Sequence, residues 1–494
     1  MIKKAGQNKI ITFIKNNWPL LIILLIGAFL RLYRIGEYMT FLGDEGRDAI
    51  IVRRLLVYGD PILIGPGTSV GSMYLGPLYY YFMAPFLFLS NFSPIGPAIG
   101  VTLLGVATIY LVYLSGKNWF SKKVGLISAV LFATAPVVII YSRSSWNPNI
   151  MPFFALLSIY SIWKVFKEKK YKWLLITAVS FAFVMQSHYL GLLLAPVLIV
   201  FWLLAKVPLK YTFFSLALFL FLMSPLLIFD IRHNYINTNA LYKFFTVRQE
   251  TISIRPWNAI PKSYPIFEQI NTSLLSANNL LVGKYITIAI TLFIIWVFAF
   301  KKKNILGPNY YLLILWLAFS LIGFGLYKQH IYDHYFGFLF PVSFILTALL
   351  LQEILKSKLK YIGTIALLFL VFNNLSKSPI RSSPNKQMQR AEMVAEKIKI
   401  ESNGEPLNLA VLAERNYEDG YQYFLEKDNV KVVEIDAQIE ESVVDQLFVA
   451  CELSLEKCDP THSPKTEVAN FGWSKIENQW EVDGVFVFKL IHSQ

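Results

Sequence analysis

The chain has little charge and little cysteine for its length. Charged residues make up 16% of its 494 residues, whereas a soluble globular domain usually contains about 25%. Its two cysteines, Cys451 and Cys458, are too few for a disulfide framework and have no metal-ligand motif around them. Together with a hydrophobic content of 55%, these shortages exclude an ordinary soluble enzyme and indicate an integral membrane protein.

Apolar runs near the length of a spanning helix recur from residue 18 to residue 376. The first run has a basic front but no small-residue cleavage site after it, so we expect a retained helix rather than a signal peptide. A run at 76–90 is short and contains two prolines and three tyrosines, which suits an interfacial helix. We expect spans at 18–34, 96–115, 124–141, 150–166, 173–188, 190–205, 211–229, 284–300, 310–326, 335–353 and 361–376.

The lysine clusters predict which side of the membrane each loop faces. If 76–90 does not span, every cluster lies on the side of the N-terminus, and cytoplasmic loops are the ones enriched in Lys and Arg. This rule favours eleven spans and a cytoplasmic N-terminus, although a twelfth, tilted span at 76–90 stays open. The net charge of +14 then belongs to cytoplasmic loops rather than to nucleic-acid binding. The clusters are Lys3–Lys15, Lys117–Lys123, Lys164–Lys172, Lys206–Lys210, Lys301–Lys303 and Lys356–Lys360.

Polar residues gather in the loops that this topology places outside the cytoplasm, at 35–95, 142–149, 188–190, 230–283 and 327–334. The spans themselves contain almost no ionisable residues, whereas ion-coupled transporters usually keep such groups near the bilayer midplane. A carboxylate pair ringed by basic residues at the outer rim suits chemistry on a lipid-borne phosphate. The candidates are Asp44, Glu45, Arg47, Tyr74, Arg143, Asn147, Asn149, His188, Tyr189, Arg232, Lys328, Asp333, His334 and Tyr335.

Each candidate also has a structural interpretation. Asp44 and Glu45 open a stretch that resembles the start of an amphipathic helix, where acidic residues cap the helix and interact with its dipole. Arg143 and Arg232 resemble anchors at the membrane interface. A lone His188 is more often a hydrogen-bonded core residue than a ligand. Only the convergence of these residues on one face favours the functional interpretation.

Five stretches occur in an order that resembles a known family: GDEGRDAIIVRRLL, GPLYYYFMAPFLFL, YSRSSWNPN, SHYLGLLLAP and YDHYFGFLFPV. Over residues 15–375 the chain is similar to bacterial GT-C glycosyltransferases of the protein O-mannosyltransferase, lipid A aminoarabinose transferase and RgtA/B/C/D-like type. The resemblance implies transfer of a sugar from a polyprenyl-phosphate carrier to an acceptor outside the cytoplasm. It also implies an α-helical polytopic membrane fold and a bacterial plasma-membrane location.

The resemblance implies roles for individual residues. The first-loop aspartate, here Asp44, is the base on the acceptor hydroxyl, and Glu45 holds the second acidic position. The basic residue that faces the donor phosphate is His188, where Lys is common, and the late Arg-Tyr…Pro element begins here with His334 and Tyr335. Relatives often have Asp where this chain has Asn147 and Asn149. These departures leave the donor sugar and any divalent metal open, although the histidine spacing matches no metal motif and no cofactor is expected.

The chemistry of the residues agrees with this interpretation. Breaking a bond between an anomeric carbon and phosphate needs one base for the acceptor hydroxyl and cations for the leaving phosphate. Asp44 and Glu45 are the catalytic candidates, and inversion is expected because no second carboxylate is placed as a nucleophile. The acceptor can be a lipid, a glycan or a protein, and the alternative function is a lipid-linked sugar flippase or exporter. Donor-phosphate candidates are Arg143, His188, Arg232, Lys328 and His334; substrate candidates are Arg47, Tyr74, Asn147, Asn149, Tyr189, Asp333 and Tyr335.

The C-terminal part differs in composition from the rest. A Ser/Pro/Lys-rich linker at 377–388 separates a transmembrane domain, 1–376, from a small extracytoplasmic α/β domain, 389–494. Residues 389–402 predict an amphipathic helix, and 407–412, 430–435, 446–450 and 484–490 predict short strands. Cys451 and Cys458 can pair in an oxidising compartment, but their spacing leaves this open.

Overall fold

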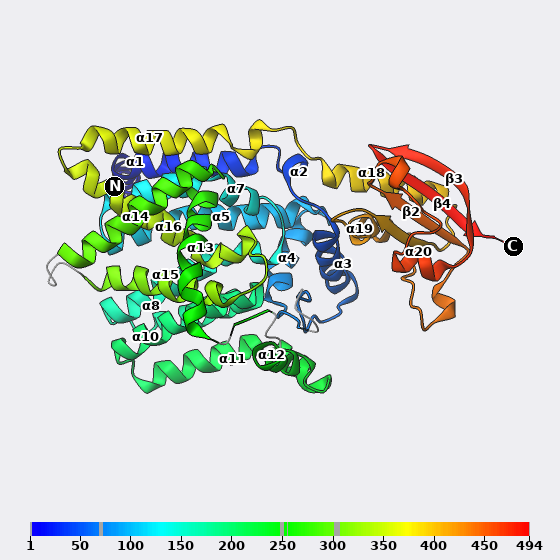
Figure 1. The fold of residues 1–494 in the computed structure, drawn as a ribbon, viewed down its shortest axis with the longest axis horizontal. Helices are drawn as coiled ribbons and strands as arrows, with labels where there is room; N and C mark the ends of the chain where they lie inside the picture. The colour runs from blue at the N-terminus through cyan, green and yellow to red at the C-terminus, as the bar shows by residue number, and fades with distance from the viewer. Residues whose placement is uncertain (1, 69–72, 248–250, 254, 301–306, 494) are drawn as a thin grey trace.

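A computed structural model describes residues 2–68, 73–247, 251–253, 255–300 and 307–493, so the Lys301–Lys303 cluster lies outside the described residues. A bundle of helices forms the larger part of the molecule, and a small domain with a sheet lies at one end of it (Figure 1). The helices of the bundle are α1 (Ile2–Leu32), α2 (Ile35–Tyr38), α3 (Gly43–Tyr58), α4 (Leu78–Leu89), α5 (Ile95–Trp119), α6 (Lys122–Thr134), α7 (Pro136–Tyr141), η1 (Asn147–Ile150), α8 (Met151–Glu168), α9 (Trp173–Ser187), η2 (Tyr189–Leu194), α10 (Ala195–Ala205), α11 (Leu209–Arg232), α12 (Ile236–Thr246), η3 (Pro256–Ala259), α13 (Ile260–Leu275), α14 (Leu280–Phe300), α15 (Pro308–Leu326), η4 (Asp333–Leu339), α16 (Phe340–Lys356) and α17 (Lys360–Ser376).

Six helical segments of the described chain are long and apolar enough to cross a membrane: Ile95–Trp119, Asn147–Glu168, Leu209–Arg232, Leu280–Phe300, Pro308–Leu326 and Asp333–Lys356. Shorter apolar helices lie at Asn17–Leu32, Leu78–Leu89, Trp173–Ser187, Tyr189–Ala205 and Lys360–Ser376. The expected α-helical polytopic class is therefore observed, while the count of eleven spans stays a prediction. The 12 residues of α4 extend only about 18 Å, against a hydrocarbon core of about 30 Å.

The span expected at 124–141 is broken into α6 and α7. Pro136 begins α7, and because proline has no backbone N–H, the chain cannot continue the hydrogen bonds of α6 through it. Arg31 from α1 donates to the backbone oxygen of Ala133 at 2.9 Å, near the end of α6. The buried guanidinium of Arg31 thus satisfies a carbonyl group that the break leaves without a helical partner.

The small domain is an α/β unit with a four-stranded sheet in the order β1-β2-β4-β3. Strand β1 pairs parallel with β2, and β4 pairs antiparallel with both β2 and β3. The disulfide Cys451–Cys458 joins the end of β2 to the segment after η7. The elements are η5 (Pro379–Arg381), α18 (Gln387–Glu401), β1 (Asn408–Leu412), α19 (Asp419–Lys427), η6 (Glu440–Ser442), β2 (Gln446–Cys451), η7 (Leu455–Lys457), α20 (Thr466–Phe471), β3 (Ser474–Val482) and β4 (Val485–His492).

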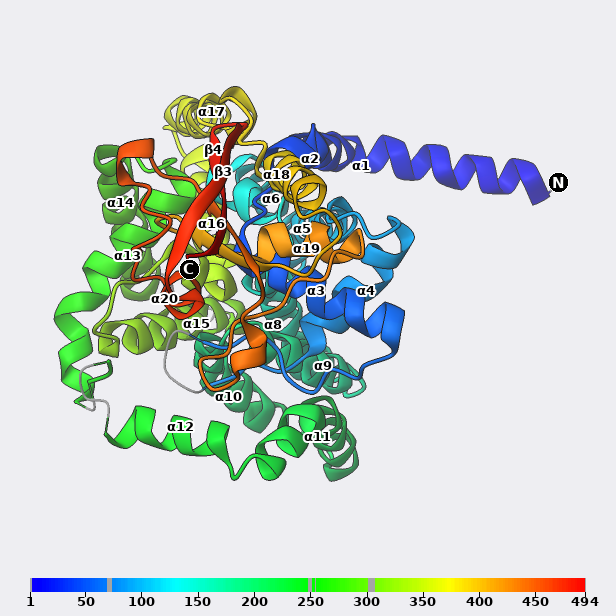
Figure 2. The same ribbon diagram turned by 90° about the vertical axis from the view of Figure 1, so that its right-hand side faces the viewer.

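One hydrophobic core joins the small domain to the first helices after α1. Ile50 of α3 and Tyr80 of α4 are buried in the same cluster as Val394 of α18 and Phe424 of α19. Two views of the ribbon show α3 and α19 side by side at the junction (Figures 1 and 2). The carboxylates at the start of α3 therefore lie where the bundle meets the small domain.

Candidate functional site

The start of α3 carries the two acidic residues that the sequence singles out. Glu45 folds back, and its Oε2 accepts a hydrogen bond from the backbone N–H of Leu42 at 3.0 Å, which caps the helix. Its side chain is buried, and burial raises the pKa of Glu45 to about 7. The helix-capping interpretation thus describes what the Glu45 carboxylate does in this structure, whereas the Asp44 side chain keeps 40% of its surface exposed.

Arg47 connects Asp44 to a third carboxylate, Asp48. Its guanidinium forms ion pairs of 2.8 Å with Asp44 Oδ1 and of 2.8 Å with Asp48 Oδ1. Asp48 is fully buried, and Tyr80 from α4 donates its hydroxyl to the same Oδ1 at 3.1 Å. Burial raises the pKa of Asp48 to about 6, although Arg47 opposes the rise. Asp44 is therefore the carboxylate of this group that remains open to a substrate.

The sequence placed Asp48 among the charges of the first external loop and Tyr80 in a tyrosine cluster, but it assigned neither residue a role in the site. Asp48 follows Asp44 by four residues, so a helical register alone puts the two carboxylates on one face. This signal was present in the stretch GDEGRD. Tyr80 comes from a different helix, and no local pattern pairs it with Asp48.

The small domain covers the start of α3. Asn416 Oδ1 accepts a hydrogen bond from the backbone N–H of Gly43 at 2.9 Å. One turn later, Gly46 lies against the backbone of Asp419, where even a Cβ atom would come within 2.4 Å of the Asp419 carbonyl oxygen. Burial, and next the neighbouring Glu418 carboxylate, raise the pKa of Asp419 to about 7, while Arg47 opposes the rise. The charges of Arg47 and Asp44 thus affect the pKa of Asp419, a residue of the small domain.

Stability should depend on pH through Asp419. The pKa of Asp419 is raised in the folded protein. Its contribution to the free energy of unfolding is therefore fully present below about pH 4 and is lost as the pH rises through about 7. We expect the Tm of the wild type to fall between pH 5 and pH 8 and that of Asp419→Asn to fall less, by roughly 2–4 °C. Glu45 and Asp48 titrate in both proteins and account for the remaining slope.

The measurement is thermal unfolding of purified protein across that pH range. Asp445→Asn, at an exposed aspartate of the same domain, is the matched control and should keep the wild-type slope. Parallel profiles for the wild type and Asp419→Asn would show that Asp419 is not the titrating group.

A second cluster contains the rings of His188, His334 and Tyr335. The His188 ring lies 6.2 Å from that of His334 and 4.8 Å from that of Tyr335, measured between centroids. Trp146 packs against His334 at 4.6 Å. His188 Nδ1 accepts a hydrogen bond from the Leu190 backbone N–H at 3.2 Å, so its other ring nitrogen carries the proton in the neutral form and can donate to a ligand.

The loop between α7 and η1 links this histidine cluster to the carboxylates. Ser145 Oγ lies 2.7 Å from the Tyr79 hydroxyl, and Tyr79 precedes Tyr80 of the Asp48 network. The next residue, Trp146, packs on His334. Two side-chain amides in this loop hold its shape: Asn147 donates to the Ser187 carbonyl at 2.7 Å, and Asn149 donates to the Ser144 carbonyl at 2.9 Å.

Tyr74 and Tyr189 belong to a separate hydrogen-bond network. The Tyr189 hydroxyl donates to the Tyr74 carbonyl, and Asn237 both accepts from the Tyr74 N–H at 2.8 Å and donates to the Tyr189 hydroxyl at 3.1 Å. Asp230 accepts from the Asn237 N–H at 2.7 Å. This network fixes the segment before α4 against η2 and the start of α12. The sequence did not single out Asn237, and it placed Asp230 in an external loop without assigning it a role.

The three other basic candidates lie after α7, at the end of α11 and after α15. The buried Arg143 turns to the end of α1, where it donates to the carbonyls of Leu30 at 3.3 Å and Tyr33 at 2.6 Å. Burial lowers the pKa of Arg143 to about 10. Arg232 is exposed at the end of α11, and Lys328 is exposed after α15.

In the part of the chain that the structure describes, no three His, Cys, Asp or Glu side chains converge as metal ligands would.

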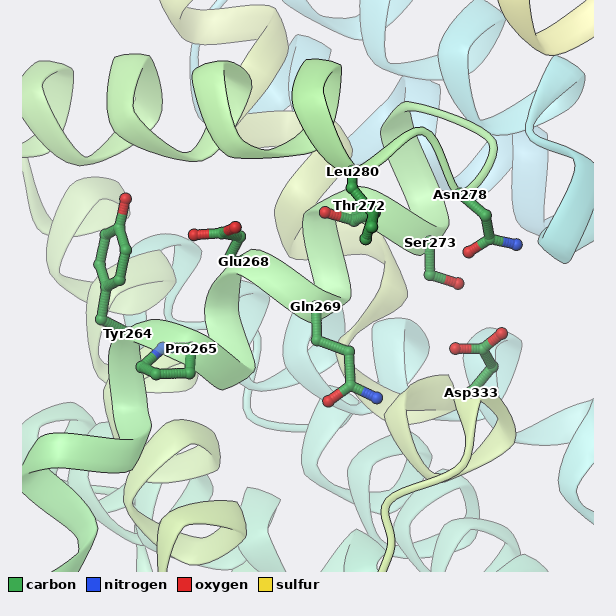
Figure 3. Close-up of a pocket in the computed structure, with 9 residues that line it drawn as sticks. All are labelled: Tyr264, Pro265, Glu268, Gln269, Thr272, Ser273, Asn278, Leu280 and Asp333. Carbon is green, nitrogen blue, oxygen red and sulfur yellow. The ribbon is translucent and has the colours of Figure 1, made fainter.

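Asp333 lines a pocket of about 440 Å³ between α13, the start of α14 and η4. Figure 3 shows Glu268, Gln269 and Ser273 projecting from α13, with Asp333 facing Ser273 from the other side. Asp44 is not among the described residues that line this pocket.

Comparisons with known proteins confirm the expected resemblance. Residues 75–229 match the family model described as dolichyl-phosphate-mannose-protein mannosyltransferase, a match that begins after Asp44. No curated protein sequence matches the chain.

The fold is that of solved membrane proteins. ArnT from Cupriavidus metallidurans bound to undecaprenyl phosphate superimposes with a TM-score of 0.63 at 10% identity, covering 96% of this chain and 98% of that one. The archaeal oligosaccharyltransferase AglB from Archaeoglobus fulgidus, in complex with an inhibitory peptide and a dolichol-phosphate, gives a TM-score of 0.56 at 14% identity, covering 88% and 70%. At these identities the likeness shows the fold, which is of the GT-C type.

Proposed function

We propose that this chain is a GT-C glycosyltransferase that transfers a sugar from a polyprenyl-phosphate donor to a lipid, glycan or protein acceptor of the cell envelope. The family match over 75–229 and the fold shared with ArnT and AglB support the reaction class. The observation that carries the proposal is the open Asp44 carboxylate, held by Arg47 and linked through Ser145 and Trp146 to the histidine cluster.

The reaction then proceeds by displacement at the anomeric carbon. The acceptor hydroxyl gives its proton to the Asp44 carboxylate as its oxygen bonds to the anomeric carbon, a contribution of about 10²–10⁴-fold. The bond from that carbon to the phosphate oxygen breaks, and the phosphate keeps the electron pair. His188 and His334 donate hydrogen bonds to the leaving phosphate, and the exposed cations Arg232 and Lys328 raise the local positive potential. A single displacement inverts the configuration of the anomeric carbon, so a product with retained configuration would contradict this mechanism.

The placement of the molecule in the membrane is part of this proposal. We take residues 1–376 as the transmembrane domain, 377–388 as a linker and 389–494 as a small extracytoplasmic domain, in a bacterial plasma membrane with a cytoplasmic N-terminus. The Cys451–Cys458 disulfide supports an oxidising compartment for the small domain. The lysine clusters support the cytoplasmic side for the opposite loops.

The test is transfer by purified protein in lipid nanodiscs, with a panel of radiolabelled polyprenyl-phosphate sugars and a crude envelope extract as acceptor. Label that moves to the extract supports the proposal and identifies the donor. No transfer from any donor contradicts it, and a silent protein that scrambles labelled lipid between leaflets indicates a flippase instead.

A further inference from the structure

The pocket beside η4 has a composition unlike that of the proposed phosphate site. The lining contains two carboxylates, two amides and three hydroxyl groups, and none of the nine described lining residues is Lys, Arg or His. Phosphate sites in proteins need cations or helix N-termini. This lining therefore disfavours an anion and favours a ligand that donates many hydrogen bonds. The lining residues are Tyr264, Pro265, Glu268, Gln269, Thr272, Ser273, Asn278, Leu280 and Asp333.

The Ser273 hydroxyl is a buried polar group of the pocket that pairs with the Asp333 carboxylate. The residue is 3% exposed, and its hydroxyl faces the Asp333 carboxylate in Figure 3. Burial raises the pKa of Asp333, and the Ser273 hydroxyl opposes the rise. A ligand hydroxyl or amine beside this pair can hydrogen-bond to both groups.

The walls of the pocket are fixed by close packing. Gly283 of α14 lies so near Thr272 of α13 that a Cβ atom would come within 2.0 Å of Thr272 Oγ1. Asn271 donates to Thr287 Oγ1 at 3.1 Å, which joins α13 to α14. Gln269 donates to the Ile331 carbonyl at 3.1 Å and joins α13 to the segment before η4. The pocket is thus formed before a ligand binds, as small-molecule sites usually are.

The pocket and the histidine cluster share η4. Asp333 lines the pocket, while the next two residues, His334 and Tyr335, face His188. Adjacent Cα atoms are about 3.8 Å apart, so the backbone of η4 joins the pocket to the group that we assign to the leaving phosphate. A volume of about 440 Å³ falls within the range of ligand sites.

We propose that this pocket binds a sugar ring that carries free hydroxyl or amino groups and no acidic group. Glu268 and Asp333 accept hydrogen bonds from the ring substituents, and the amides and hydroxyls of the lining supply the remaining hydrogen bonds. Tyr264 covers one end of the pocket. This inference rests on the proposed glycosyl transfer for its biological meaning, and it deepens that proposal by naming the chemical class of the sugar. The ring belongs either to the donor or to the acceptor.

Binding is tested separately from transfer, so the two proposals can fail separately. Saturation-transfer NMR on the full-length protein in nanodiscs uses methyl glucoside, glucosamine, glucuronate and glucose 1-phosphate as probes. We expect signals from the first two and roughly tenfold weaker binding of the two anions. Glu268→Gln should weaken glucosamine binding by roughly tenfold because a charge-assisted hydrogen bond becomes a neutral one. Glu456→Gln, at an exposed glutamate of the small domain, is the control and should bind like the wild type.

The transfer assay then assigns the source of the sugar. A KM that rises in Glu268→Gln for the polyprenyl-linked donor assigns the pocket to the donor sugar, and one that rises for the envelope extract assigns it to the acceptor. Absence of signal from all four probes overturns the inference, as does stronger binding of the anions. Tyr264→Ala, at an exposed position of the pocket rim, gives a second variant that should weaken binding without disturbing the packed walls.

Discussion

Asp44→Asn is expected to lower the rate of sugar transfer by roughly 10²–10⁴-fold, the range of a general base. Asparagine has the size of aspartate and keeps an oxygen that accepts the hydrogen bond from Arg47, now 2.8 Å from Asp44 Oδ1. It cannot take a proton from the acceptor hydroxyl at neutral pH. The loss should therefore appear in kcat rather than in the KM for the donor, as measured with the donor that the nanodisc assay identifies.

Asp60→Asn is the matched control for this substitution. Asp60 is an exposed aspartate in the loop that follows α3, and its replacement should leave the transfer rate unchanged. The Tm of both variants should equal that of the wild type. If Asp44→Asn keeps more than a tenth of the wild-type rate, another group must act as the base, and the buried Asp48 is the next to test.

Gly46→Val is expected to separate the small domain from α3. The first added carbon would lie 2.4 Å from backbone atoms of Asp419 and Gly420, and a backbone cannot give way as a flexible side chain can. Overpacking of this kind costs about 1–3 kcal/mol, which raises the population of the undocked domain by roughly tenfold. Trypsin should then cut the part of the linker that precedes α18, residues 377–386, faster in the same proportion, provided that reclosing is fast.

Gly420→Ala tests the same interface without the clash. A Cβ atom there would lie 3.5 Å from the backbone of Leu42, an ordinary van der Waals distance, so this variant should be cleaved at the wild-type rate. Equal cleavage of Gly46→Val and Gly420→Ala would contradict the tight packing of α3 on α19. Transfer measured on the same variants shows whether the docked domain is needed for activity.

The sequence predicted what depends on local pattern and composition. The apolar runs and the change in composition near residue 377 indicated a helical bundle followed by a small α/β domain, and α18 begins within two residues of the expected helix. The strand expected at 430–435 makes only an isolated bridge, between Leu407 and Val432. The strand β3 was missed because its residues are mostly polar and exposed, as suits the edge of a sheet.

The arrangement of the site was harder to predict because its contacts join distant segments. Asp44 and Arg47 are neighbours on one helical turn, which the sequence can indicate. The direction of Arg143, which turns to the end of α1, depends on carbonyl groups that a different helix leaves free. The proximity of Asp419 to Arg47 requires the docking of two segments that lie about 370 residues apart, and no short-range pattern encodes it.

The core shared by α3, α4 and the small domain has a consequence for synthesis. Ribosomes add roughly 5–20 residues per second, so roughly 20–70 s pass between the synthesis of Ile50 and that of its core partner Val394. During that time α3 can pack only on α4, and the apolar surface that later contacts α18 and α19 must be shielded by a chaperone or by the membrane surface. The surroundings of the carboxylates are therefore completed last, and a chain that terminates before α18 would insert its helices yet expose this part of the core and be prone to aggregation.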